Sequence, residues 1–183
     1  MKTKWLYLVL FLTLQSCVDD RPYKTYTAKE LITVEIPEDM QVQAEGIIPN
    51  QQVYLLGEKK TPLEMGMDFY KKNDLTTYGV PFTTDEIYNS ESEKFAEVLS
   101  EMKMEKPKNE RISHMESSWG HIYGKINNEA YIFRLTVSNG GAYFYTFYVG
   151  AKEKDFKKNE KVIKHIVESV DEFRDFEALN NQN

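Results

Sequence analysis

"YIFRLTVSNGGAYFYTFYVG", residues 131–150, is the stretch that decides the fold of this chain. Its two halves are rich in aromatic and β-branched residues, which favour strands. They meet at Asn139–Gly140, a dipeptide typical of tight turns between antiparallel strands. The stretch therefore predicts a hairpin of two strands, over residues 129–138 and 141–150. A two-residue turn would set three pairs across it: Val137 with Ala142, Leu135 with Phe144, and Phe133 with Thr146.

The two faces of this hairpin are expected to differ in role. Side chains alternate along a strand, so Tyr131 and Tyr148 fall on one face, which we expect to be core. The opposite face carries Arg134 among tyrosines, a combination common at interface hot spots. With the preceding strand it gives a candidate binding face of six residues: Trp119, Tyr123, Arg134, Tyr143, Tyr145 and Phe147. In the alternative interpretation a helix covers these aromatic residues and they are core. A turn one residue longer would also change the pairs and could swap the faces.

The rest of the pattern predicts further strands and two long helices. Strands are expected at 32–36, ended by Pro37, at 52–56, at 63–70, and at 111–116 leading into 119–126. Thr83 and Glu86 have the spacing of a capping box, which predicts a helix over 84–103. A second helix is expected over 153–171. This order indicates an α+β fold, an antiparallel β-sheet packed with two main α-helices.

The first 17 residues have the pattern of a secretory signal. Lys2 and Lys4 precede a largely apolar run of ten residues, Trp5 to Leu14. That run is too short to cross a bilayer as a helix, which needs roughly 20 residues, but it suits the apolar core of a signal peptide. Leu14, Gln15, Ser16 and Cys17 then stand where a soluble protein would have small residues for cleavage.

This "LQSC" segment resembles the lipobox of bacterial lipoproteins. The resemblance implies cleavage between Ser16 and Cys17, diacylglyceryl transfer to the Cys17 sulfur, and acylation of the new amino terminus by a fatty acid such as palmitate. Two or three acyl chains give a lasting membrane anchor. The alternative is a buried or free thiol; in either case a single cysteine excludes an intramolecular disulfide. Asp19 and Asp20 resemble an export signal of some Gram-negative groups, or form a solvated tether. We therefore expect the Gram-negative cell envelope and favour its outer membrane, with the membrane face open.

Length and charge limit the possible classes of protein. At 183 residues the chain suits one domain of ordinary size. Removing the leader leaves 21 basic and 29 acidic residues, a net charge of −8. Such a body repels nucleic acid, and an anionic membrane surface would not attract it as a whole. We expect a signal peptide over 1–16, the lipidated cysteine and a tether over 17–27, a domain over 28–173, and a frayed tail over 174–183.

The order of elements resembles the PsbP-like fold, including periplasmic lipoproteins of the DcrB kind. Three segments carry the resemblance: "LITVEIPEDM" at 31–40, the aromatic hairpin, and "VIKHIVESV" at 162–170, where Ser169 matches a common small residue. The resemblance implies the fold of that family. It also implies a binding or assembly module, because such proteins mostly act in this way.

The sequence offers little catalytic or metal-binding chemistry. It contains no nucleophile elbow, Walker-type loop, dinucleotide fingerprint or paired zinc motif. His114 and Glu116 share one face of a strand and His121 lies close along the chain, but a metal ion needs three or four convergent ligands. The favoured alternative is a solvated sheet face. Glu64 and Asp68 share a face with no evident partner to tune their acidity, and His165 is expected at the surface. We assign no catalytic residue, metal or cofactor.

We therefore expect a lipid-anchored envelope protein that is not an enzyme and acts as a protein-binding or assembly accessory module. Its expected partners are the membrane, through Cys17, and another envelope protein. The alternative is a protein that binds a small ligand or lipid in a pocket between the sheet and the 84–103 helix. That pocket would be lined by Met65, Met67 and Met102. A third hypothesis, an enzyme, would use His114, Glu116 and His121.

Overall fold

The computed structural model describes residues 21–76 and 82–173. The predicted signal peptide over 1–16, the lipidation site Cys17, the acidic pair Asp19–Asp20 and the tail over 174–183 lie outside the described residues.

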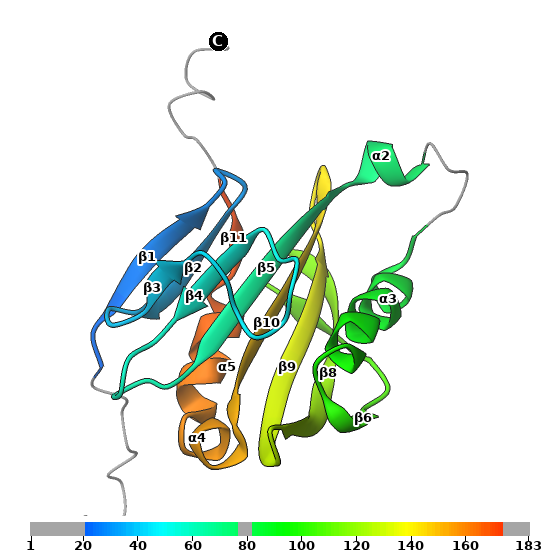
Figure 1. Cartoon of the computed structure of the whole chain (residues 1–183). Helices are drawn as coiled ribbons and strands as arrows, with labels where there is room; N and C mark the ends of the chain where they lie inside the picture. The colour runs from blue at the N-terminus through cyan, green and yellow to red at the C-terminus, as the bar shows by residue number, and fades with distance from the viewer. Residues whose placement is uncertain (1–20, 77–81, 174–183) are drawn as a thin grey trace, which may run out of the picture.

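The larger layer is an eight-stranded antiparallel sheet. Its strand order is β3-β4-β5-β10-β9-β8-β6, and β7 also pairs with β8 (Figure 1). The bounds are β3 Gln41–Gln43, β4 Val53–Leu56, β5 Glu64–Lys71, β6 Ser100–Met104, β7 Lys108–Ile112, β8 Met115–Ile126, β9 Glu129–Asn139 and β10 Tyr143–Lys152. A second sheet of three strands has the order β1-β2-β11, with β1 Tyr23–Ala28, β2 Ile32–Pro37 and β11 Asp171–Glu172.

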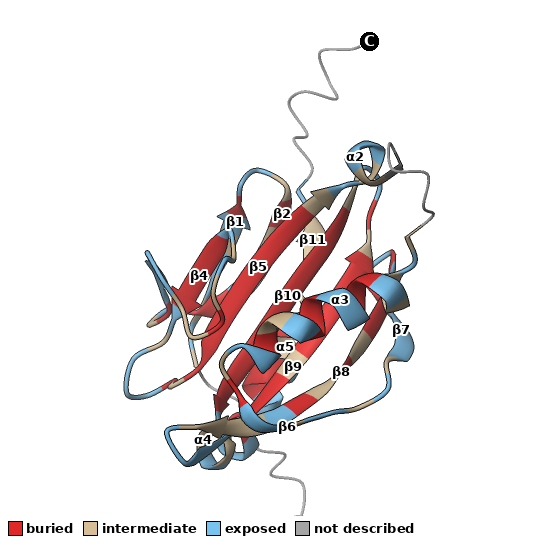
Figure 2. Cartoon of the chain, turned by 45° about the vertical axis from the view of Figure 1, so that its right-hand side comes forward, coloured by how far each residue is buried: buried red, intermediate tan, exposed pale blue. Residues whose placement is uncertain are grey.

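Helices cover both faces of the large sheet. Helix α3 (Thr84–Ala96) lies across β8 and β9 on one face. On the other face lie α4 (Glu153–Lys158), α5 (Glu160–Glu168) and the small sheet (Figure 1). A short helix, α2 (Lys72–Thr76), follows β5. The central strands are therefore buried along most of their length (Figure 2). The predicted α+β fold with an antiparallel sheet is confirmed.

Two hydrophobic cores result, one on each face of the large sheet. The core under α3 contains Tyr88, Phe95, Phe133, Leu135 and Tyr148. The other core joins the small sheet, α4 and α5 to the opposite face; it includes Ile32, Val34, Ile36, Met65, Met67, Phe147, Ile163 and Ile166. Within residues 21–76 and 82–173, every helix is too short or too polar to cross a membrane.

The hairpin of β9 and β10 has the predicted faces but a different register. Val137 pairs with Thr146, Leu135 with Tyr148, and Phe133 with Gly150, so each partner lies four positions further along than predicted. The reason is a longer connection: the strands end at Asn139 and begin again at Tyr143, and Gly140 N donates to Tyr143 O over 3.0 Å. An even shift leaves each side chain on its own face, so the predicted assignment of faces holds.

Both predicted helices are shorter than expected. The capping box of α3 is confirmed, because Glu86 N donates to Thr83 Oγ1 over 3.2 Å and Thr83 N donates to Glu86 Oε2 over 2.8 Å. The helix ends at Ala96, however, because residues 100–104 form β6 and pair with β8. The 153–171 segment is divided at Asn159 into α4 and α5, and its last residue, Asp171, is the first of β11, which pairs with β2.

Two other predicted boundaries are wrong. The expected strand over 111–116 is two strands, since β7 and β8 are joined by a turn at Ser113–His114 with Ser113 at φ 53°. Residues 23–28 are not part of a tether but form β1, which pairs along its whole length with β2. Half-buried Tyr23 and Tyr26 pack against the core and hold this strand in place.

Candidate functional site

The structure divides the predicted binding face into two parts. Tyr145 and Phe147 are only 3% and 1% exposed and belong to the core beneath the small sheet and α5. For these two residues the prediction is wrong, and the alternative of a covered aromatic core holds. Tyr143 is half-buried beside Tyr145. The remaining residues, Trp119, Tyr123 and Arg134, lie on the same face of the sheet, nearer the edge formed by β6 and β7.

Trp119 is the centre of this surface. Arg134 Cζ lies 4.0 Å from the centroid of its ring and Lys108 Nζ lies 4.9 Å from it, so two cations contact one indole. Arg134 is held further by Glu110, with 2.5 Å between Nη2 and Oε1, and its side chain is only 12% exposed. Burial lowers the pKa of Arg134, and the neighbouring carboxylates of Glu110 and Glu168 offset part of that effect.

The carboxylate of Glu105 contacts three side chains at the other end of this surface. Lys108 Nζ and Tyr123 Oη each donate to its carboxylate over 3.0 Å, and His121 Nδ1 lies 3.3 Å from it. Partial burial alone would raise the pKa of Glu105, but Lys108, Tyr123 and His121 outweigh it and lower the pKa to about 2. We call the set Lys108, Trp119, His121, Tyr123 and Arg134, with Glu105 and Glu110, the Trp119 surface.

The Trp119 surface is suited to recognition. Tryptophan, tyrosine and arginine are the residue types most enriched at binding hot spots. Their positions are already fixed by β8, β9 and the ion pairs, so little side-chain freedom remains to be lost on binding. Tyr123 is 36% exposed, so part of this ordered surface faces solvent.

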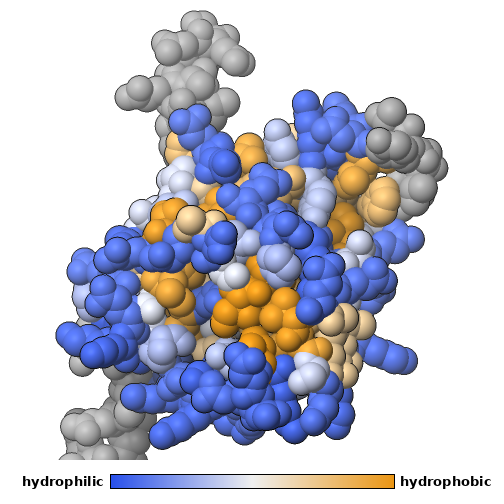
Figure 3. Space-filling view, in the orientation of Figure 1, coloured by the Kyte–Doolittle hydropathy of each residue, from blue (hydrophilic) through white to orange (hydrophobic). Residues whose placement is uncertain are grey.

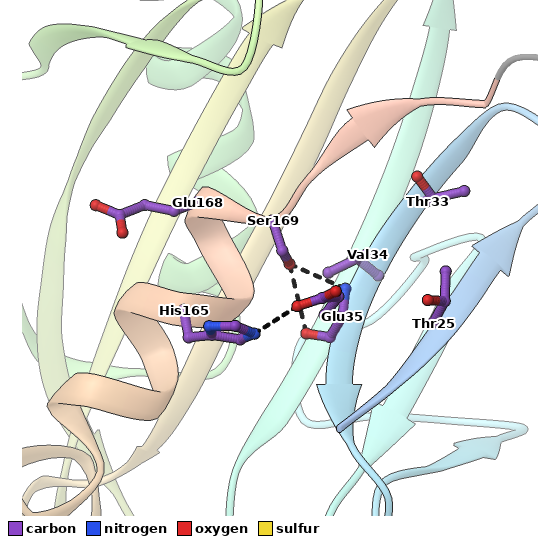
Figure 4. Close-up of a pocket in the computed structure, with 7 residues that line it drawn as sticks. All are labelled: Thr25, Thr33, Val34, Glu35, His165, Glu168 and Ser169. Carbon is purple, nitrogen blue, oxygen red and sulfur yellow. Dashed lines mark hydrogen bonds and ion pairs between the residues drawn. The ribbon is translucent and has the colours of Figure 1, made fainter. Parts of the chain in front are cut away.

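A separate pocket of about 430 Å³ lies between the small sheet and α5 (Figure 4). It contains serine, histidine and glutamate, the residue types of a hydrolase triad. His165 Nε2 lies 2.7 Å from Glu35 Oε2, but Ser169 Oγ accepts from Glu35 N over 2.9 Å and donates to Ile166 O over 2.8 Å. The serine is thus bonded to backbone groups and not to the imidazole, so this geometry does not couple a nucleophile to a base. As expected, His165 is at the surface; its partner Glu35 was not predicted.

The histidines of the enzyme hypothesis do not converge. His114 lies 2.9 Å from Glu172 and 3.1 Å from Asp171, both on β11. His121 contacts Glu105, and Glu116 is exposed. Across the two described ranges, no group of three His, Cys, Asp or Glu residues is placed to hold a metal ion.

The methionines of the ligand-pocket hypothesis are also separated. Met65 and Met67 are completely buried on the face of the sheet opposite α3, whereas Met102 lies on β6 beside the α3 core. They cannot line one cavity, so that prediction is wrong.

A buried ionic cluster, which was not predicted from the sequence, lies under α3. Asp68 and Glu91 are 3% and 4% exposed, and Lys94 Nζ bridges them at 2.8 Å and 3.0 Å. Tyr70 Oη donates to Glu91 and accepts from Lys94 over 3.1 Å, and Gln52 N donates to Asp68 over 2.9 Å. The cluster therefore fastens both α3 and the segment before β4 to β5. One signal was present: Glu91 falls on the helix face of buried Ile87 and Phe95, where an apolar residue is expected.

Glu64, on the same strand as Asp68, is another buried carboxylate with hydrogen-bond partners. This carboxylate is 5% exposed, accepts from Tyr148 Oη over 2.6 Å and from Ile47 N over 2.9 Å, and burial raises its pKa. The expectation that Glu64 and Asp68 lack partners is wrong.

Fold and surface together define the class: an α+β domain with an ordered aromatic and cationic surface and a PsbP-like arrangement of strands. Several solved structures share the fold, and three of them follow. The cyanobacterial PsbP (CyanoP) of Synechocystis sp. PCC 6803 has a TM-score of 0.62 and 9% sequence identity, over 87% of this chain and 99% of that one. A mutant of the protein Mog1 has a TM-score of 0.55 and 8% identity, over 84% of this chain and 97% of that one. LpqN, involved in cell envelope biogenesis of Mycobacterium tuberculosis, has a TM-score of 0.52 and 8% identity, over 85% of this chain and 88% of that one. No family model matches the chain, and no curated protein does.

Proposed function

We propose that this protein is a lipid-anchored envelope protein that binds another envelope protein through the Trp119 surface and performs no catalysis of its own. The observation that carries the proposal is the half-buried indole of Trp119, which the cationic groups of both Arg134 and Lys108 contact. Two lines of support stand beside it. LpqN, which shares the fold, is described as involved in cell envelope biogenesis, and residues 14–17 resemble a lipobox.

The anchor is tested by the mass of the protein. The chain isolated from its host's membranes should begin at Cys17 and carry the added mass of diacylglyceryl and acyl groups. Replacing Cys17 by alanine should abolish this mass and release the protein from the membrane fraction. An unmodified thiol at Cys17 in the native protein would contradict the anchor.

Binding is tested by photocrosslinking in intact cells. A photoreactive phenylalanine at Tyr123 should join the protein to one dominant envelope protein. The same group at half-buried Tyr26, on the small sheet, is the matched control and should not give that product. Trp119→Ala should reduce the product about 30-fold, since truncating a hot spot costs roughly 2 kcal/mol or more.

The fold of the variant must be checked, because Trp119 also packs within the protein. Thermal unfolding of Trp119→Ala shows whether the domain remains folded at the temperature of the experiment. A folded variant with undiminished crosslinking, or equal products at positions 123 and 26, would contradict the proposal.

A further inference from the structure

The described chain begins at a definite place in the fold. Arg21 Nη1 donates to Asn159 Oδ1 over 2.7 Å and to Thr61 Oγ1 over 3.5 Å, and Glu38 N donates to Pro22 O over 3.1 Å. These contacts bring together the start of the chain, the β2–β3 turn, the β4–β5 loop and the junction of α4 and α5 at the lower side of Figure 1. We call residues 21–24, 38–39, 57–62 and 152–161 the Arg21 end.

The Arg21 end differs in charge from the rest of the protein. Its four segments contain nine basic and six acidic residues, a net charge of +3, in a chain whose total is −6. Four of its exposed lysines form no ion pair with any described residue: Lys59, Lys60, Lys154 and Lys158. The acidic average of the whole chain therefore conceals a basic end, whose sum is still positive, at +1, when the preceding Asp19 and Asp20 are counted with it.

An apolar side chain lies among these lysines. Leu56, the last residue of β4, is 46% exposed. It borders a hollow of about 730 Å³ together with two lysines, Lys59 and Lys60, and two carboxylates, Asp39 and Glu58. Figure 3 shows the hydrophilic side chains that dominate this lower margin of the molecule. Lysines beside an exposed leucine are suited to the boundary between lipid headgroups and acyl chains, where the ammonium groups stay in the polar layer.

The number of residues between Cys17 and Arg21 limits the distance between a lipid anchor on Cys17 and the Arg21 end. Arg21 follows Cys17 by four residues. Four residues span at most about 14 Å when fully extended. The Debye length at physiological salt, over which a charged membrane surface acts, is about 8–10 Å, so a tether that is not fully extended brings Arg21 within that range. With acyl chains on Cys17, the Arg21 end is thus the part of the domain nearest the bilayer.

We propose that the Arg21 end rests on anionic phospholipid headgroups, with its lysines against the lipid phosphates. The proposal depends on the lipid anchor proposed above. It assigns the orientation of the domain: the far ends of β1 and β5, with Lys29 and Lys71, point away from the membrane, because both strands run from the Arg21 end toward the opposite end (Figure 1).

The test is lysine footprinting on the lipidated protein in vesicles. The protein is reconstituted in phosphatidylcholine alone or with phosphatidylglycerol, and amine acylation is followed at each lysine by mass spectrometry. In the anionic vesicles, Lys59, Lys60, Lys154 and Lys158 should react about fivefold more slowly, the ratio that corresponds to roughly 1 kcal/mol per lysine near an anionic surface. High salt should remove the difference. Lys29 and Lys71 are exposed controls in the same molecule and should react equally in both.

Two double variants distinguish a specific effect of the Arg21 end from an effect of the protein's total charge. Lys59→Gln with Lys60→Gln should weaken protection at Lys154 and Lys158, whereas Lys29→Gln with Lys71→Gln changes the charge equally and should leave it intact. Equal rates in both vesicles for a protein that is acylated and attached would overturn the orientation and leave the anchor standing. Absence of acyl mass on Cys17 would overturn both.

Discussion

Replacing Lys94 by methionine should destabilise the domain through the buried cluster. Asp68 and Glu91 would keep their positions but lose the ammonium that lies 2.8 Å and 3.0 Å away. Burial alone lowers the pKa of Lys94, but Asp68, Glu91 and Tyr70 outweigh it and the pKa is raised, so the side chain is charged under all ordinary conditions.

The magnitude follows from the burial of the partners. Removing one member of a buried ion pair costs about 3–5 kcal/mol. Lys94 is 26% exposed, so water screens part of the interaction; we expect a loss of about 2–3 kcal/mol. In a domain of this size that corresponds to a fall in Tm of about 4–12 °C.

The assay is urea unfolding followed by tryptophan fluorescence, with thermal unfolding by circular dichroism beside it. Lys71→Met is the matched control; Lys71 is exposed, so its loss should change the unfolding free energy by less than about 0.5 kcal/mol. Adding Glu91→Gln to Lys94→Met should restore about 1 kcal/mol or more, because it removes one uncompensated buried charge. If Lys94→Met and Lys71→Met are equally stable, the cluster does not stabilise the fold and this reasoning is refuted.

Three further predictions concern other parts of the domain. In a carboxyl NMR titration Glu105 should stay ionised at pH 4 and titrate near pH 2, with a higher midpoint in Tyr123→Phe; a midpoint in the ordinary range would show that the Trp119 surface is not assembled in solution. Burial alone would raise the pKa of Glu172, but His114, Gly141 N and Tyr145 lower it, so its stabilisation is present at neutral pH and lost as pH falls through the lowered pKa. Glu172→Gln should therefore lower Tm at pH 7, and the difference from the unchanged protein should shrink as pH falls below the ordinary glutamate pKa and vanish below the lowered pKa of Glu172; a constant difference would contradict this. Thr83→Ala should cost about 1 kcal/mol in urea unfolding while Thr83→Ser is nearly neutral, unless the capping box is unformed in solution.

The sequence was most informative where its pattern has a strict period. Alternation along residues 131–150 predicted which side chains share a face, and that assignment survives a register shift because the shift is even. The register itself depends on how many residues the turn takes, and Asn139–Gly140 alone does not determine that number. The 84–103 helix was overestimated because residues 100–104 have no helix-breaking residue; their place on β8 is decided by a contact distant in sequence.

The candidate site was predicted only in part for a related reason. Trp119, Tyr123 and Arg134 were identified, but whether a helix covers a given part of a sheet face is a tertiary property, and Tyr145 and Phe147 proved to be covered. The partners of Asp68 were missed because Lys94 lies 26 positions further along the chain. A carboxylate on a strand is normally exposed, so only the contact itself reveals that it is buried.

The small sheet has a consequence for the order in which the chain can complete its fold during synthesis. β11 pairs with β2, and the hydrogen bond from Thr33 to Asp171 joins residues 138 positions apart. At roughly 5–20 residues per second, a ribosome needs about 7 to 28 s to make that interval. Until then Ile32, Val34 and Ile36 on β2 lack the α5 side chains that bury them. The nascent chain therefore presents an unfinished apolar strand for most of its elongation.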